Sequence, residues 1–218
     1  MRLVYMNPNA TESMTSAVVA AAQKALPEVD ILGLTNVDGP AAIEGPEDGA
    51  KAVSGLLSML PKAKELGADA IIIACFDDTG LAELRAVAGC PVLGIGQSSY
   101  TMAQLLGLPF SVVTSLPVSV PVIEANINDT GFGPMCQSVR ASGLGVLEID
   151  EGAPAALARL SEEISLAQSQ DSAAAVILGC AGMARLRKTL AALTDVTLID
   201  GVSASAHLAQ ATVRFMPA

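Results

Sequence analysis

Two stretches of the chain decide its fold: Ala68-Asp69-Ala70-Ile71-Ile72-Ile73-Ala74-Cys75 and Ala173-Ala174-Ala175-Val176-Ile177-Leu178-Gly179-Cys180. Each is a short apolar run that ends in a cysteine and is followed by a turn of small residues and a helical pattern. Runs of this length and composition are typical of buried parallel strands. Because ligands bind at the carboxyl ends of strands in open α/β sheets, we expect both thiols at a ligand-binding edge.

The two stretches belong to an internal repeat, since Cys180 follows Cys75 by 105 positions. The same shift aligns further pairs without a gap: Leu81 with Leu186, Leu93 with Leu198, Gly96 with Gly201, and Ser98 with Ser203. A period of this length is too long for a solenoid and predicts two similar lobes. We place the first lobe at residues 1–97 plus 203–218 and the second at 98–202.

Strand-like and helix-like segments alternate through both halves. The expected strands are 2–7, 29–34, 69–75, 91–95, 111–115, 145–149, 173–180 and 196–200. The expected helices are 11–26, 50–66, 81–87, 98–106, 118–128, 153–169, 181–193 and 203–215, with a kink or break in the second of them at Pro61. This alternation predicts an α/β fold of two pseudo-symmetric lobes, each a four-stranded parallel sheet flanked by helices. The loop over 35–49 is long enough to be functional.

Composition restricts the class of protein. Apolar residues make up 51% of the 218 positions and aromatic residues 3%, so small aliphatic side chains must fill the core. The net charge of −10 argues against binding to nucleic acid or to an anionic membrane surface. The apolar runs are of strand length, and no targeting segment is visible. Four widely spaced cysteines without a CxxC pair are typical of reduced thiols, which predicts a cytoplasmic protein.

Three motifs resemble those of the hydantoin/allantoin racemases, a family of the aspartate/glutamate racemase superfamily. They are Asn7-Pro8-Asn9, Cys75-Phe76-Asp77-Asp78-Thr79-Gly80-Leu81 and Gly179-Cys180-Ala181-Gly182-Met183. The resemblance covers almost the full chain in order. It implies an active site between the lobes, a small-molecule substrate, a homo-oligomer, and racemisation without a cofactor by Cys75 and Cys180, one on each face of the substrate carbon.

The residues after the cysteines depart from those of related enzymes. Amino-acid racemases of the superfamily carry Cys-Asn-Thr and Gly-Cys-Thr, whereas this chain has Phe76-Asp77 and Ala181-Gly182 in the following positions. The departure favours a neutral ring or carbamoyl substrate, such as a 5-substituted hydantoin or allantoin, over a free amino acid. Within the hydantoin branch, a proline is common at the position of Thr79 and a smaller residue at that of Asp77.

Racemisation needs one group that removes a proton and another that returns one to the opposite face. A cysteine with an ordinary pKa of about 8.5 can serve in both roles. Each cysteine precedes a predicted helix, whose N–H groups favour a thiolate and can stabilise an enolate oxygen. Small residues such as Ala181 and Gly182 allow backbone to approach the ligand. The single histidine and the absence of clustered ligands argue against zinc, and we expect no cofactor.

The predicted substrate-binding residues lie in the turns after four strands: Asn7, Pro8, Phe76, Asp77, Asp78, Thr79, Thr114, Ala181 and Gly182. Asp77 and Asp78 could instead cap a helix, and Asn7 could be only a turn former. Cys90 and Cys136 are interpreted as structural. Two other functions stay open from the sequence: an aspartate/glutamate-type amino-acid racemase, and a noncatalytic small-molecule binding protein with two α/β lobes.

Overall fold

The central strands of the fold are buried on both faces, as expected of parallel strands covered by helices. A computed structural model describes residues 1–216, so the last two residues assigned above to the first lobe lie outside the described part. The strands form two parallel sheets of four, in the orders β2-β1-β3-β4 and β6-β5-β7-β8. Their bounds are β1 (Arg2–Asn7), β2 (Asp30–Thr35), β3 (Ala70–Ile73), β4 (Val92–Gly94), β5 (Phe110–Thr114), β6 (Cys136–Ala141), β7 (Ala175–Gly179) and β8 (Thr197–Asp200).

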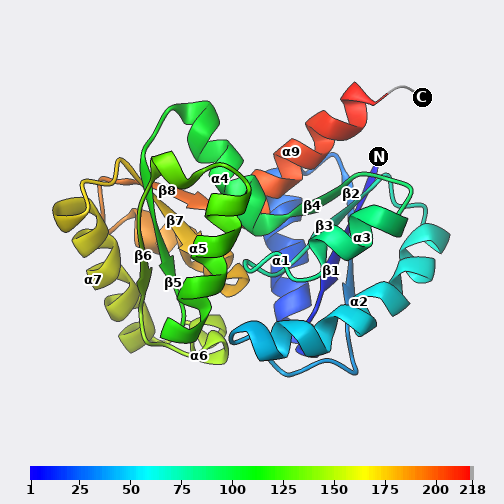
Figure 1. The fold of residues 1–218 in the computed structure, drawn as a ribbon, viewed down its shortest axis with the longest axis horizontal. Helices are drawn as coiled ribbons and strands as arrows, with labels where there is room; N and C mark the ends of the chain where they lie inside the picture. Colours follow the sequence, from blue (N-terminus) through cyan, green and yellow to red (C-terminus); the bar gives the residue numbers. More distant parts are fainter. Residues whose placement is uncertain (217–218) are drawn as a thin grey trace.

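The shared strand order confirms the predicted α/β architecture with two similar sheets, which lie side by side in Figure 1. The helices are α1 (Glu12–Ala25), α2 (Pro46–Glu65), α3 (Leu81–Val87), α4 (Ile95–Leu106), α5 (Val120–Asp129), α6 (Val146–Glu151), α7 (Pro154–Gln170), α8 (Arg187–Ala191) and α9 (Gly201–Phe215). Short 3₁₀ turns are η1 (Pro117–Ser119), η2 (Gly133–Met135) and η3 (Ala181–Leu186). Within residues 1–216, no helix combines the length and apolar character needed to cross a bilayer.

One hydrophobic core joins the two sheets. Ile72 of β3 and Ile177 of β7 belong to the same cluster of buried side chains, although they come from different sheets. The alternate side chains of these strands, such as Ile73 and Leu178, point to the opposite faces and join separate clusters. Because side chains alternate along a strand, a continuous apolar run fills cores on both faces at once.

Helices α4 and α9 pack together at the junction between the sheets (Figure 1). A Cβ atom on Gly201, the first residue of α9, would lie 2.4 Å from the carbonyl oxygen of Ile95 in α4. A Cβ atom on Gly96 would lie 2.3 Å from the carbonyl oxygen of Phe76. The repeat aligns these two glycines, and both occupy positions of close backbone approach where a side chain does not fit.

The expected strand over 145–149 is wrong, because this segment begins helix α6. Val146 and Ile149 are both buried and lie three residues apart, which is the spacing of one helix face. The fourth strand of this sheet is β6 instead. It lies at the edge of the sheet, is only partly buried and contains polar residues, so it lacks the apolar run that marks a central strand.

Of the kink or break predicted at Pro61, the break does not occur, since α2 runs through this residue. Proline removes one backbone donor from a helix interior. Leu56, Leu60 and Ala63 are buried along the same helix. The apolar contacts of this face therefore hold the helix together across the missing hydrogen bond.

A network of ion pairs attaches the edge strand β6 to α7. Arg140 Nε lies 2.9 Å from Glu163 Oε2, and Arg140 Nη1 lies 2.7 Å from Asp171 Oδ1. The Glu163 side chain is only 8% exposed. Asp171 also accepts a hydrogen bond from the hydroxyl of Ser111 on β5. This network explains why the strand carries charged and polar residues.

We expect Arg140→Met to lower the free energy of unfolding by about 2 kcal/mol, because it removes the cation shared by Glu163 and Asp171 and leaves Glu163 paired with Arg159 alone. Urea unfolding followed by circular dichroism measures the change. Lys62→Met is the matched control, because Lys62 pairs with Glu65 in an exposed position, and this substitution should cost less than about 0.5 kcal/mol. Equal effects of the two substitutions would contradict the structural role of Arg140.

Candidate active site

The two thiols of the repeat line one small cavity at the junction of the sheets. Cys75 lies in the turn after β3, and Cys180 lies directly after β7 at the start of η3. Both contact the same cavity of about 30 Å³, together with four other predicted site residues: Phe76, Asp77, Thr114 and Ala181. The carboxyl ends of β3, β5 and β7 therefore meet at one point, as expected for parallel sheets.

Cys75 is surrounded by groups with opposing effects on its ionisation. Burial raises the pKa of the Cys75 thiol well above its ordinary value, and the nearby Asp77 carboxylate raises it further. The backbone N–H of Asp77 and the hydroxyl of Thr79, which lies 3.8 Å from the sulfur, act in the opposite direction. The balance favours the thiol form in the empty site.

Cys180 shows the same balance with different donors. Burial raises the pKa of this thiol to about 12, while the N–H groups of Gly182 and Met183 lower it. The carboxylates of Asp77 and Asp150 add a smaller upward shift. The expectation that helix N–H groups favour a thiolate is therefore outweighed by burial at this position. In addition, α3 begins only at Leu81, so a turn rather than a helix follows Cys75.

The two neighbouring aspartates have separate roles. Asp78 Oδ1 accepts a hydrogen bond of 2.9 Å from Gly96 N, and Asp78 Oδ2 accepts one of 2.7 Å from Gln97 N. Asp78 thus binds the first turn of α4, whereas Asp77 lines the cavity. Burial raises the pKa of each carboxyl to about 7.

Five of the predicted binding residues do not line the cavity: Asn7, Pro8, Asp78, Thr79 and Gly182. The Asn7 amide donates hydrogen bonds to Asn9 Oδ1 at 2.9 Å and to Thr15 Oγ1 at 3.0 Å, which fixes the turn after β1. Asn9 itself lines the cavity. Thr79 and Gly182 instead lie beside the thiols, as donors to sulfur.

The cavity also has lining residues outside the predicted set. They include Met14, Ile43, Ser119 and Val146, and Ser115 lies beside the predicted Thr114. Met14 comes from α1, Ser119 comes from the segment after β5, and Val146 comes from the segment after β6. No motif of the sequence connects these three segments. The length of the loop containing Ile43 was the one signal that indicated a role for it. Ser115 and Ser119 make no side-chain hydrogen bond within residues 1–216, so both hydroxyls are available to a ligand.

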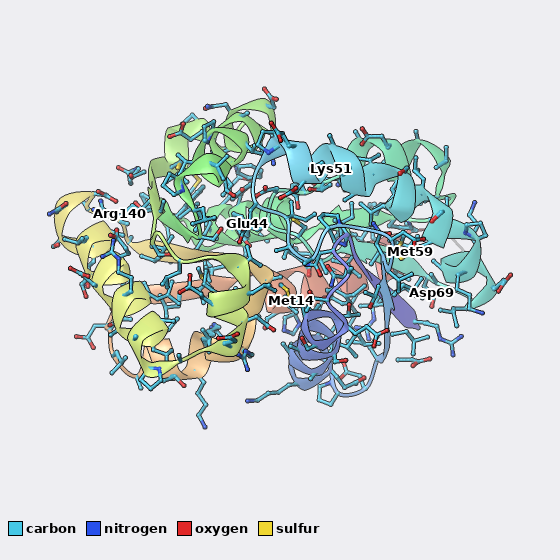
Figure 2. The ribbon with its side chains drawn as sticks, turned by 90° about the horizontal axis from the view of Figure 1, so that it is seen from below. Met14, Glu44, Lys51, Met59, Asp69 and Arg140 are labelled. Carbon is cyan, nitrogen blue, oxygen red and sulfur yellow. The ribbon has the colours of Figure 1, made fainter. Side chains whose placement is uncertain are left out.

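A contact between the sheets closes the cavity. Glu44 Oε1 accepts a hydrogen bond of 2.8 Å from the backbone N–H of Val146, at the start of α6. The adjacent Ile43 is buried against the cavity. Figure 2 shows Glu44 and Met14 at the junction between the two halves of the molecule. A cavity of about 30 Å³ has room for about one water molecule, so a ring substrate requires this loop to open.

Another, much wider groove of about 1120 Å³ runs along β4 and α9. It contains Cys90 but neither thiol of the repeat. Among residues 1–216, no group of three or more histidine, cysteine or acidic side chains is arranged to hold a metal ion.

Comparisons with known proteins agree with this geometry. A family model described as Asp/Glu/Hydantoin racemase matches residues 3–209. A hydantoin racemase from Rhizobium meliloti is 41% identical over 212 residues, covering 97% of this chain and 88% of that protein. An allantoin racemase structure from Klebsiella pneumoniae has a TM-score of 0.93 at 33% identity, covering 98% of this chain and 88% of that one. A second, from Pseudomonas fluorescens, has a TM-score of 0.93 at 34% identity, with coverages of 98% and 91%.

These matches extend over nearly the whole chain and include both thiol turns. The chain therefore belongs to the Asp/Glu/Hydantoin racemase family.

Proposed function

We propose that this protein is an isomerase that racemises 5-substituted hydantoins or allantoin without a cofactor, with Cys75 and Cys180 as its two acid–base groups. The observation that carries the proposal is the placement of two thiols from duplicated turns against one buried cavity. Family membership supports racemisation, and the high similarity to hydantoin and allantoin racemases supports a ring or ureido substrate.

The reaction removes the proton from one face of the substrate carbon and adds a proton to the opposite face. The thiolate of one cysteine removes the proton from carbon 5 of the ring and becomes a thiol, while the electron pair moves onto the adjacent carbonyl oxygen. The opposite thiol returns its own proton to the other face and becomes a thiolate. The enzyme then holds the mirror-image protonation state and is ready for the other enantiomer.

The developing negative charge on the enolate oxygen needs hydrogen-bond donors in a site that excludes water. The hydroxyls of Ser115 and Ser119 supply such donors at the cavity wall. The proton at carbon 5 of a hydantoin is more acidic than that of an amino-acid zwitterion, because no carboxylate opposes formation of the carbanion. We therefore expect the donors and thiols of this site to carry the reaction.

We expect Cys75→Ser and Cys180→Ser each to lower the rate of 5-benzylhydantoin racemisation by at least about 100-fold, because a serine hydroxyl does not replace a thiol in proton transfer. Decay of the circular dichroism of one enantiomer measures racemisation, and proton exchange in deuterium oxide measures abstraction from each enantiomer. Cys90→Ser, outside the cavity, is the control and should retain the full rate. Full racemisation by either site variant would disprove the two-thiol mechanism.

The raised pKa values of both thiols predict a rate that increases with pH. A thiol whose pKa is raised is mostly protonated at pH 7, and its thiolate fraction grows tenfold with each pH unit below that pKa. We expect log kcat/KM to rise between pH 7 and pH 9 with a slope near one, because kcat/KM reports the ionisations of the free enzyme. A plateau reached below pH 8 would show that burial does not control the thiols.

Glu44→Ala tests the closure of the cavity. Loss of the hydrogen bond to Val146 should favour the open loop that admits the ring and lower KM for 5-benzylhydantoin by about tenfold, since a bond to a charged group that holds the loop closed is removed. Initial rates by circular dichroism give KM, and limited proteolysis within residues 36–45 reports opening. Glu47→Ala, an exposed change in the first turn of α2, is the matched control. An unchanged KM in Glu44→Ala would exclude this contact as the closing element.

A further inference from the structure

Asp77 differs from the other polar residues of the cavity in both charge and bonding. It is the only acidic residue among those that line the cavity in the described chain. Its carboxylate accepts no hydrogen bond from any group within residues 1–216, whereas both oxygens of the adjacent Asp78 are occupied by backbone N–H groups. A partly buried carboxylate that faces a cavity and has no protein donor is available to accept a hydrogen bond from a ligand.

The backbone of Asp77 is held in place independently of its side chain. Asn126 Nδ2 donates a hydrogen bond of 2.8 Å to the Asp77 carbonyl oxygen, and the Asp77 N–H points to the sulfur of Cys75. The carboxylate interacts electrostatically with the thiols of Cys75 and Cys180. It therefore lies close to the position where the substrate carbon must sit between the two sulfurs.

The charge of the cavity wall limits what can bind. No lysine, arginine or histidine lines the cavity, so the α-carboxylate of an amino acid would find no cation there. It would also face the negative charge of Asp77. Burial of an unpaired charge beside a like charge is strongly unfavourable. A neutral ring with N–H groups instead offers the donor that the Asp77 carboxylate lacks.

Resting on the racemase function above, we propose that Asp77 selects the substrate: its carboxylate accepts the ring N–H next to the reacting carbon and excludes substrates that carry an α-carboxylate. The substrate class is then a neutral cyclic ureide with a free N–H at ring position 1. Asp77 acts as a binding and positioning residue, while the thiols perform the proton transfers.

The ionisation of Asp77 fixes the conditions of the test. Burial raises the pKa of this carboxyl to about 7, so the carboxylate predominates at pH 8. The titratable groups coupled to it are Cys75, Cys180, Asp78 and Tyr100. At this pH Cys75, Cys180 and Tyr100 are mostly uncharged, whereas Asp78 is mostly ionised and stays bound to α4. Assays at pH 8 therefore compare substrates against a charged Asp77.

The first experiment compares 5-benzylhydantoin with its 1-methyl derivative, which lacks the N–H in question. We expect the wild-type enzyme to prefer the N–H compound by about 10- to 100-fold in kcat/KM, the range for a hydrogen bond to a charged group. Asp77→Leu, of similar volume but without an acceptor, should reduce this preference to about threefold or less. Asp129→Asn, exposed at the end of α5, should keep the wild-type preference.

The second experiment tests exclusion of carboxylates with N-carbamoyl-phenylalanine as an inhibitor. Asp77→Asn removes the charge and keeps the shape, so it should lower the inhibition constant by about tenfold relative to wild type. Asp77→Asn also provides a folded Asp77 variant to test if Asp77→Leu does not fold. Thermal unfolding shows whether each variant is folded. An unchanged inhibition constant would show that Asp77 does not exclude carboxylates.

The results separate failure of this proposal from failure of the racemase function. If the wild-type enzyme exchanges no carbon-5 proton of either hydantoin in deuterium oxide, the racemase function itself is wrong. If it exchanges that proton but Asp77→Leu keeps the full preference for the N–H compound, the function stands and Asp77 does not bind the ring N–H. A preference that is lost only in the Asp77 variants supports the proposal.

Discussion

The bond between the Asp78 carboxylate and the first turn of α4 is the constraint on which the site depends. The two N–H groups of Gly96 and Gln97 belong to a helix start, where unpaired donors favour a negative charge. A Cβ atom on Gly94 would lie 2.0 Å from Asp78 Oδ1, so the carboxylate fits only against glycine. Asp78 adopts a left-handed backbone with φ of 50°, which this bond stabilises. The turn that carries Cys75 is thereby fixed to the junction of the sheets.

The second thiol turn is built differently, although the strands that precede the two turns correspond. Cys180 begins a 3₁₀ turn whose own N–H groups surround its sulfur. In this half, Asp200 caps its own helix by accepting a hydrogen bond of 2.7 Å from Ser203 N. The duplication therefore provides two thiols at matching strand ends, while local differences give them unequal surroundings. A site that acts on two mirror-image substrates needs an acid–base group on each side of the substrate carbon, and the surroundings of the two groups need not be identical.

Burial has two opposing effects on the chemistry. It raises the pKa of both thiols and so reduces the thiolate available in the empty enzyme. It also excludes water, which strengthens each hydrogen bond to the enolate that forms during the reaction. Closure by the loop with Glu44 increases both effects. The Asp77 carboxylate adds selectivity at the expense of a further rise in the thiol pKa values, which ties substrate choice to rate.

Sequence alone determined the architecture and the catalytic candidates of this protein. Continuous apolar runs at a shift of 105 residues predicted two parallel sheets, because only strands buried on both faces need such runs. The sequence did not predict the edge strand β6, which contains Arg140. Its polar residues are explained by ion pairs with α7, a helix distant in the sequence. Only the tertiary structure separated Asp77 from Asp78 and brought Ile43, Ser119 and Val146 to the thiols. Those placements depend on how helix ends and loops from different parts of the chain pack at the junction, which no local pattern of residues encodes.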